Sequence, residues 1–322
     1  MWASEIEPFP VKVTQKHFPN MIQYGDITKI HGNEMVPVTI IVGGSPCTDI
    51  SVAGKIVGLN GDKSKLFFDQ IRIIKEMRDE AKHKTDFSVR ARYAVWENVP
   101  SILSTNGKED FRTVLESFCQ IKDKEAYVPM PTEKWTPSGA IMGSGKYSVA
   151  WRVLNGEFWG VPAKRRRLFL VADFDGDTAP EILFKRGGLS RNFAEIREAW
   201  EGSTTRTKED VGEAICFDMT HGDDPARIIG TKAPTLQHRM GTGGNQIPLV
   251  YNQNGKGKIR RLTPQECAML QGFPSWWCKD VPDRSDTAEY KMWGNGMCLP
   301  CVLYIIEGIK EELDKEVKKE GR

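Results

Sequence analysis

The fold is decided by the stretch Val38-Thr39-Ile40-Ile41-Val42-Gly43-Gly44-Ser45-Pro46-Cys47. Residues 38–42 are β-prone and almost continuously apolar, which predicts a central strand of a parallel sheet, buried on both faces. Gly43 and Gly44 end that strand and begin a loop. In open parallel sheets, ligands bind outside the carboxyl ends of the strands. The stretch therefore predicts an α/β fold with a site at this loop.

Strands and helices alternate after this loop. Apolar residues at helical spacing predict a helix over 66–77, and a second apolar pattern predicts a helix over 111–118. Residues 92–96, 147–153 and 168–172 are predicted strands. Such alternation is typical of βαβ units, so we expect a doubly wound, mostly parallel α/β sheet.

Helical character returns near the C-terminus. We expect Thr263 to be an N-cap, Pro264 to occupy the first helical position and Glu266 to complete a capping box. A longer helix with an apolar stripe is expected from 299 to 320. The sequence between these parts of the chain is rich in glycine, threonine and charge. We divide the chain into an α/β domain that is incomplete at its N-terminus (1–174), an irregular insert (175–258) and a return to the α/β domain (259–322).

Composition excludes some classes of protein. The 45 Lys and Arg nearly balance the 43 Asp and Glu, which excludes a histone-like polycation but allows a local basic groove. No apolar run approaches the roughly 18 residues of a membrane span, and the start lacks an apolar signal core, so we expect a cytoplasmic protein without membrane contact. Seven cysteines, an odd number, argue against a disulfide framework. No second cysteine pair joins Cys298 and Cys301, so we expect no metal site.

Three segments carry reactive or charged side chains. Cys47 follows a stiffening proline at the end of the first strand and is a candidate nucleophile, although a free cysteine on its own is more often a core residue. Glu97 ends the next strand and is a candidate acid or hydrogen-bond donor. Arg165 and Arg167 share one face of an extended segment, and their planar guanidinium groups suit a carbonyl or a phosphate.

Taken in this order, Pro46-Cys47, Glu97-Asn98-Val99 and Arg165-Arg166-Arg167 resemble the DNA (cytosine carbon-5) methyltransferases of bacteria and phages. The segments Arg261–Pro274 and Tyr290–Met297 are similar to the last two conserved blocks of that family. The resemblance implies a Rossmann-like methyltransferase domain with the insert as a target-recognition region. It also implies a place in DNA methylation and restriction–modification.

The resemblance implies a specific chemistry. The family transfers a methyl group from S-adenosylmethionine to carbon 5 of a cytosine that is flipped out of duplex DNA. Cys47 would add to carbon 6 of the base, and Glu97 would contact N3 and the exocyclic amine. Arg167, with Arg165, would hold the base carbonyl and the loop that carries Cys47.

Further site residues come from the same resemblance. The cofactor-binding residues implied are Glu5, Ile6, Asp26, Ile27, Pro46 and Asn295. The DNA-binding residues implied are Ser51, Thr235, Leu236, Gln237, Arg239, Gly243 and Asn245.

The chain departs from the family pattern at its start. The family opens with a strand and a Phe-x-Gly-x-Gly-type loop, whereas Met1 falls where the second strand is already running. We therefore expect the first strand to be missing, a separate polypeptide to supply it, and the completed enzyme to be a monomer. Two alternatives stay open: a truncated, catalytically dead remnant that binds DNA, and cytosine-5 methylation of tRNA, against which the long insert argues.

Overall fold

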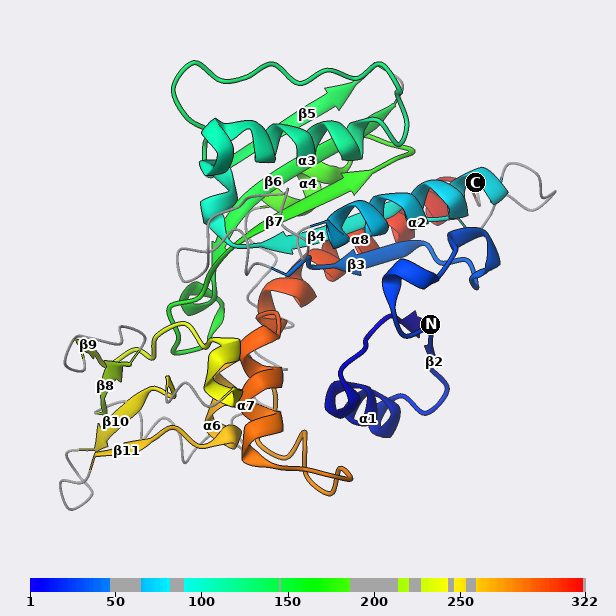
Figure 1. Cartoon of the computed structure of the whole chain (residues 1–322). Coiled ribbons are helices and arrows are strands. Elements are labelled where there is room, and N and C mark those ends of the chain that lie inside the picture. The colour runs from blue at the N-terminus through cyan, green and yellow to red at the C-terminus, as the bar shows by residue number, and fades with distance from the viewer. Residues whose placement is uncertain are drawn as a thin grey trace.

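The computed structural model describes residues 1–46, 65–81, 90–144, 146–185, 214–219, 227–242, 246–252 and 259–320. Its main body is a five-stranded sheet in the order β3-β4-β7-β6-β5 (Figure 1). The bounds of these strands are β3 (Ile40–Gly43), β4 (Tyr93–Asn98), β5 (Ser138–Gly143), β6 (Tyr147–Asn155) and β7 (Arg166–Asp173).

This sheet is mixed, which corrects the predicted mostly parallel sheet. Strands β3 and β4 run parallel, whereas the pairs β4–β7, β7–β6 and β6–β5 are antiparallel. The reason lies in the connections 144–146 and 156–165. Both are shorter than the crossover of roughly a dozen or more residues that joins parallel strands. The predicted α/β class with strands near 92–96, 147–153 and 168–172 is confirmed.

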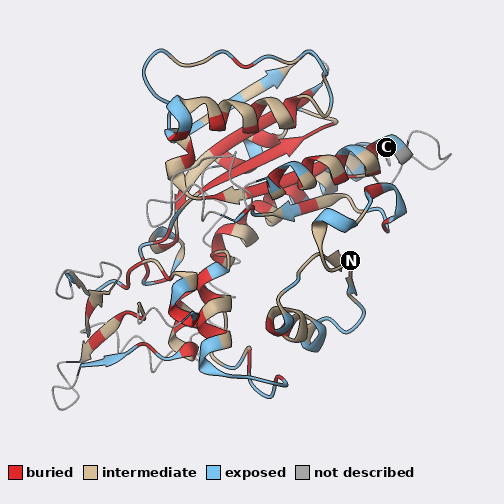
Figure 2. Ribbon diagram, viewed as in Figure 1, coloured by how far each residue is buried: buried red, intermediate tan, exposed pale blue. Residues whose placement is uncertain are grey.

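Helices cover both faces of the sheet. Helices α2 (Leu66–Ala81) and α3 (Glu109–Cys119) pack on one face, where Trp96 and Leu170 are buried. Helices α4 (Ala179–Phe184) and α8 (Leu299–Glu320) pack on the other face against Val95 and Val171. Neighbouring residues of one strand thus enter different cores, as the two-residue period of a strand requires. Figure 2 shows the central strands as the most continuously buried part of the molecule.

Strand β3 lies at the edge of the sheet. The prediction that it is buried on both faces is wrong for the described residues, since Val42 is 42% exposed while Ile41 is 6% exposed. Among the described strands, only β4 pairs with β3. The backbone N–H and C=O groups along the other side of an edge strand are open to pairing. A sequence typical of a central strand therefore occupies an edge.

The N-terminal residues form a small parallel sheet whose connecting helix packs through Phe9 and Val13 against the C-terminal part of the chain. Strand β1 (Trp2–Ala3) pairs in parallel with β2 (Ile22–Gln23), and α1 (Pro8–His17) connects them. The Ser4 hydroxyl donates to the Gly25 carbonyl at 2.7 Å, which ties together the two loops that follow these strands. Short 3₁₀ helices follow at η1 (Ile27–Lys29) and η2 (Gly32–Glu34), and others lie at η4 (Pro100–Leu103), η5 (Thr105–Lys108) and η6 (Gly156–Trp159).

A second core joins the insert to the C-terminal part of the chain. Its sheet has the order β11-β10-β8-β9, with bounds β8 (Ala214–Asp218), β9 (Arg227–Gly230), β10 (Leu249–Asn252) and β11 (Ile259–Arg261). Packed with it are η7 (His238–Gly241), α6 (Pro264–Leu270) and α7 (Asp286–Asn295). The predicted domain boundary at residue 258 falls inside this sheet, between β10 and β11.

The predicted capping box at the start of α6 is confirmed: the Thr263 hydroxyl accepts from the Glu266 amide, and the Glu266 carboxylate accepts from the Thr263 amide at 2.7 Å. Within the described segments no single helix is long and apolar enough to cross a membrane. Helices α7 and α8 meet that test only as a joined pair, and a bend of 47° separates them.

Candidate active site

Glu97 and Arg167 come together where two neighbouring strands meet. Glu97 is near the carboxyl end of β4, and Arg167 is near the start of the antiparallel strand β7. Their side chains form an ion pair of 3.0 Å between Arg167 Nε and Glu97 Oε1, and each is only 12% exposed. The pairing of β4 with β7 thus places two predicted catalytic side chains in contact although they are 70 residues apart in the sequence.

The loop after β3 begins directly against this pair. A Cβ atom placed on Gly44 would lie 3.3 Å from Glu97 Oε2 and 2.9 Å from Met297 Cε, so the backbone passes close over the carboxylate. The buried Ser45 hydroxyl accepts from Asn98 Nδ2 at 3.0 Å, which fixes the loop to the end of β4. Cys47 lies outside the described residues, as does Ser51.

Arg165 has a different set of partners from Arg167. It is 3% exposed, and its Nη1 donates to the Leu236 carbonyl at 3.2 Å. Its Nη2 donates to the Gly296 carbonyl, at the end of α7. The guanidinium group is therefore held by backbone oxygens of the insert and of the C-terminal part of the chain.

Two buried thiols, Cys298 and Cys301, lie near Arg165 and Arg167. Cys298 and Cys301 are each 1% exposed at the start of α8. A hydrogen bond from the Cys301 thiol lowers the pKa of Cys298, and the charges of Arg165 and Arg167 act in the same direction against the effect of burial. The same hydrogen bond and burial raise the pKa of Cys301.

The predicted recognition residues are placed only in part. The Thr235 hydroxyl donates to the Lys164 carbonyl at 2.5 Å, and Leu236 is buried at 3% exposure in the second core. Gln237 packs against Gly294 of α7, and Arg239 is exposed. Gly243 and Asn245 lie outside the described residues.

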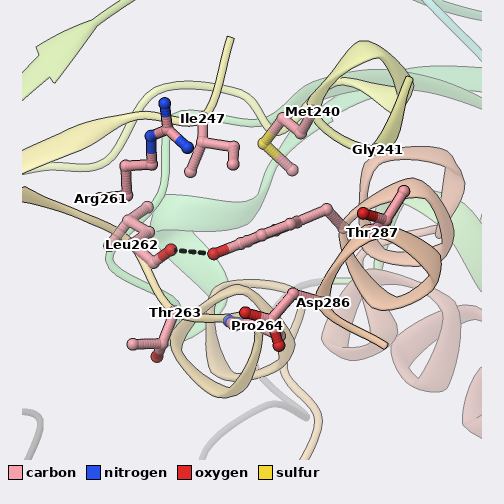
Figure 3. A pocket seen from close by; sticks show the side chains of 10 residues that line it. Met240, Gly241, Ile247, Arg261, Leu262, Thr263, Pro264, Asp286 and Thr287 are labelled. Carbon is pink, nitrogen blue, oxygen red and sulfur yellow. Dashed lines mark hydrogen bonds between the residues drawn. The ribbon is translucent and has the colours of Figure 1, made fainter. Parts of the chain in front are cut away.

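A cavity of about 450 Å³ lies beside this region, between η7, the end of β11 and the starts of α6 and α7 (Figure 3). Met240 and Leu262 line it, and the Tyr290 hydroxyl donates to the Leu262 carbonyl at 2.6 Å. None of the predicted catalytic residues is among its lining residues. The cavity therefore lies in the second core, between the insert and the C-terminal part of the chain, and not at the Glu97–Arg167 pair.

Comparison with known proteins identifies the chain. A family model described as C-5 cytosine-specific DNA methylase matches residues 1–123 and 140–311. The chain belongs to this family. Its enzyme class is therefore DNA cytosine-5 methyltransferase, as the sequence resemblance predicted.

Relatives of this methylase are named for restriction–modification systems. The type II methyltransferase M1.ScrFI of Lactococcus lactis subsp. cremoris is 26% identical over 333 residues, covering 99% of this chain and 74% of that protein. The type II methyltransferase M.Bsp6I of Bacillus sp. (strain RFL6) is 23% identical over 329 residues, covering 97% of this chain and 91% of that protein.

A solved structure supports the fold. The S. pombe Dnmt2 methyltransferase aligns with a TM-score of 0.58 and 15% identity, covering 97% of this chain and 90% of that chain. The Rossmann-like fold of the methylase is thereby confirmed.

Methylases of this family generally use S-adenosylmethionine, and the described residues fit one half of it. Glu5 and Asp26 follow the parallel strands β1 and β2, so both carboxylates lie at carboxyl ends of strands. Glu5 Oε1 accepts from the Ile6 and Glu7 amides at 2.8 Å. The Thr28 amide and hydroxyl donate to Asp26, which lowers the pKa of that carboxyl. The adjoining Ile6 is 70% exposed, which leaves an apolar surface suited to an adenine ring.

The remaining cofactor candidates lie on separate elements. Ile27 begins η1 and packs partly against the main core. Pro46 is exposed at the end of the loop after β3, and Asn295 is exposed at the end of α7. No glycine turn that would cradle the methionine half is found among the described residues near β1 and β3.

The sequence did not single out several residues that build the site. Ser45 and Asn98 fix the loop that leads to Cys47, and Gly296 and Met297 contact Arg165 and Gly44. Asn98, Gly296 and Met297 lie inside the segments that carry the family resemblance, and Ser45 directly precedes one of them, so the segments were a usable signal. The long-range contacts that give these residues a role were not readable from the chain alone.

Proposed function

We propose that this methylase transfers a methyl group from S-adenosylmethionine to carbon 5 of a cytosine flipped out of duplex DNA, through a transient bond between the Cys47 sulfur and carbon 6. The observation that carries the proposal is the Glu97–Arg167 pair with the loop of Cys47 starting against it. The acid and the cation lie together at the carboxyl end of β4, and the loop that leads to the proposed nucleophile starts beside them.

Each side chain has one task in this reaction. The Cys47 thiolate adds to carbon 6 and makes carbon 5 nucleophilic. Glu97 stabilises the adduct at N3 and at the exocyclic amine, and Arg167 holds the base carbonyl. The bound cofactor supplies an electrophilic methyl group on its sulfonium. The bond from carbon 5 to the methyl group would form as the sulfonium–methyl bond breaks and leaves a thioether. The carbon-5 proton would then pass to solvent water as the bond from carbon 6 to Cys47 breaks, giving 5-methylcytosine and the free thiolate.

The positive charges of Arg165 and Arg167 support the thiolate form that this reaction needs. A thiol pKa falls next to arginine. The hydrogen bond from Cys301 is the main cause that lowers the pKa of Cys298, and the charges of Arg165 and Arg167 add to it. The same charges are proposed to act on Cys47.

Duplex DNA is the proposed partner, and the bacterial or phage-infected cytoplasm is the proposed place of action. The exposed Arg239 suits a phosphate or a base edge. The proposed DNA contacts of Gln237, Ser51, Gly243 and Asn245 follow the family pattern. The Thr235 hydroxyl is donated to the Lys164 carbonyl, so its proposed contact with DNA is through the backbone. Leu236 has its side chain in the core, so its proposed contact is through the backbone.

A separate polypeptide is proposed to add a strand to the open edge of β3, giving a single complete catalytic unit. The edge position of an apolar strand and the 42% exposure of Val42 support this proposal. Added parallel strands pair through the same backbone groups that an edge leaves open. The new strand would bring a glycine turn to the methionine half of the cofactor.

The added strand is expected to raise cofactor affinity. We expect the chain alone to bind S-adenosylmethionine at least about 10-fold more weakly than a mixture with the strand–glycine-turn–helix unit of a family member, because one half of the site is completed in the mixture. Isothermal titration measures both affinities, with Val42→Lys as a variant that blocks pairing. Equal affinity with and without the added unit would contradict the proposal.

Bisulfite sequencing tests the reaction. The full chain is expressed in a bacterial host that has no cytosine methylation. The strand–glycine-turn–helix unit is co-expressed with it if the titration shows that this unit raises cofactor affinity. We expect 5-methylcytosine at one recurrent DNA sequence, and none with Cys47→Ser. Methylation confined to tRNA would support the RNA alternative, and retained DNA binding without methylation would support the inactive remnant.

A further inference from the structure

A short parallel pairing links the insert to the start of β7. The Lys164 amide donates to the Ala233 carbonyl at 3.0 Å, and the Ala233 amide donates to the Pro162 carbonyl at 3.0 Å. These bonds form a bridge between Ala163 and Ala233. The Thr235 hydroxyl adds a bond of 2.5 Å to the Lys164 carbonyl. Residues 233–235 thus run alongside the segment that carries the catalytic arginines.

Helix α7 packs against the residues of the insert that follow this pairing. A Cβ atom on Gly294 would lie 2.3 Å from the Gln237 carbonyl carbon and 2.5 Å from the His238 amide nitrogen, so α7 lies against this backbone. Arg165 adds to this packing by donating to Leu236 and to Gly296. One buried guanidinium therefore joins the start of β7, the insert and the end of α7.

These contacts lead directly to the Glu97–Arg167 pair. Arg167 is two residues beyond Arg165, which spans roughly 7 Å of extended chain. Strand β7 pairs with both β4 and β6 only from Leu168 onward, whereas Arg167 pairs with β6 alone, so a shift of the residues before β7 reaches Arg167 before β4 can resist it. Misplacement of a reacting group by about 1 Å can cost on the order of 100-fold in rate.

We propose that Thr235 and Arg165 are positioning residues, through which the seating of DNA on the insert sets the placement of Arg167 and Glu97. This inference rests on the proposed methyl transfer. Thr235 is half-buried and its hydroxyl proton is donated to Lys164, so the side chain acts on the protein backbone rather than as a donor to DNA.

Thr235→Val removes the hydroxyl at nearly constant volume, and Thr235→Ser keeps it. We expect Thr235→Val to lower the single-turnover rate of methyl transfer at saturating DNA by about 10-fold, with the DNA Kd changed by less than about 2-fold. Thr235→Ser is expected to restore most of the rate. Thr136→Val is the matched control, because its hydroxyl also donates to a backbone carbonyl, at 2.6 Å, on an exposed loop away from the site.

Two results would overturn the inference. If Thr235→Val binds DNA more weakly but transfers methyl groups at an unchanged rate, the Thr235 side chain contacts DNA. If both the rate and the DNA affinity of Thr235→Val are unchanged, Thr235 has no positioning role.

Hydrogen exchange separates this inference from the proposed function. Binding of the cognate duplex, or of a mixed-sequence duplex if no methylation is found, is expected to slow exchange of the Lys164 and Ala233 amides in the wild type and less in Thr235→Val. Absence of methylation by the wild type would refute the proposed methyl transfer. The exchange experiment would still test whether DNA binding at the insert affects the contact between residues 233–235 and the start of β7. Exchange at these amides that does not respond to DNA would refute the coupling.

Discussion

Replacing Arg167 with methionine is expected to lower the single-turnover rate of methyl transfer by about 100- to 1,000-fold, the range seen when one preorganised electrostatic group is removed from an active site. Two losses combine in this variant. The base carbonyl loses the cation that holds it, and Glu97, which is only 12% exposed, loses its partner at 3.0 Å. Rapid-quench measurement with a duplex that contains the target sequence gives the rate.

Arg166→Met is the matched control for this variant. Arg166 is the exposed neighbour of Arg167, so the control removes the same charge from the same strand without touching the ion pair. A rate for Arg167→Met within about 3-fold of the control would contradict the assigned role.

The pair also predicts non-additivity. Glu97→Gln is expected to lower the rate by about 100-fold or more, and the double variant with Arg167→Met is expected to be no slower than the slower single variant, because the two side chains act as a unit. Independent, multiplying losses in the double variant would mean that the two residues act at separate steps.

Replacing Gly294 with alanine is expected to lower the free energy of unfolding by about 1–3 kcal/mol, the usual cost of overpacking. The direction of this change is informative. Glycine inside a helix ordinarily costs roughly 0.5–1 kcal/mol relative to alanine, so replacing it with alanine would ordinarily raise the free energy of unfolding. At Gly294 the new Cβ would lie 2.3 Å from backbone atoms of Gln237, which can yield only if α7 and the insert separate. Urea denaturation measures the change.

Gly308→Ala provides the comparison within another helix. Its Cβ would meet the Cγ2 methyl of Ile182 at 3.0 Å and the Ile182 backbone only at 3.4 Å, an ordinary contact distance. We expect a smaller loss there than at Gly294. Stabilisation by Gly294→Ala would show that α7 does not lie against the insert as described.

Local sequence signals predicted much of the fold. The apolar spacing from residue 66 onward predicted α2, and Thr263 with Glu266 predicted the start of α6, because both signals act within a few residues. The edge position of β3 could not be predicted in this way. Its apolar sequence indicates burial, whereas the neighbours of a strand are set by distant parts of the chain.

Strand β5 shows a second limit. Its glycines resemble a loop, yet Gly139 and Gly143 lie under the rings of Trp151 and Tyr147 on β6. A Cβ atom on Gly143 would lie 2.0 Å from the Tyr147 ring, so the strand needs glycine for close packing rather than for a turn. Only the cross-strand register between β5 and β6 makes this visible.

The candidate site was predictable to a similar degree. The order of the segments around Cys47, Glu97 and Arg167 predicted that these side chains share one site, and the structure brings Glu97 and Arg167 together. The partners of Arg165 were not predictable, because Leu236 and Gly296 are distant in sequence and offer only backbone carbonyls. A backbone acceptor leaves no signature in residue type.

The most direct test of the account is covalent capture. A duplex carrying 5-fluorocytosine at the target position, incubated with the active methylase and S-adenosylmethionine, should yield a denaturation-resistant complex, since fluorine cannot leave carbon 5 as a proton does. Intact-mass and peptide analysis should place the bond on the Cys47 sulfur, with no complex from Cys47→Ser. A bond on another residue, or normal methylation by Cys47→Ser, would contradict the account.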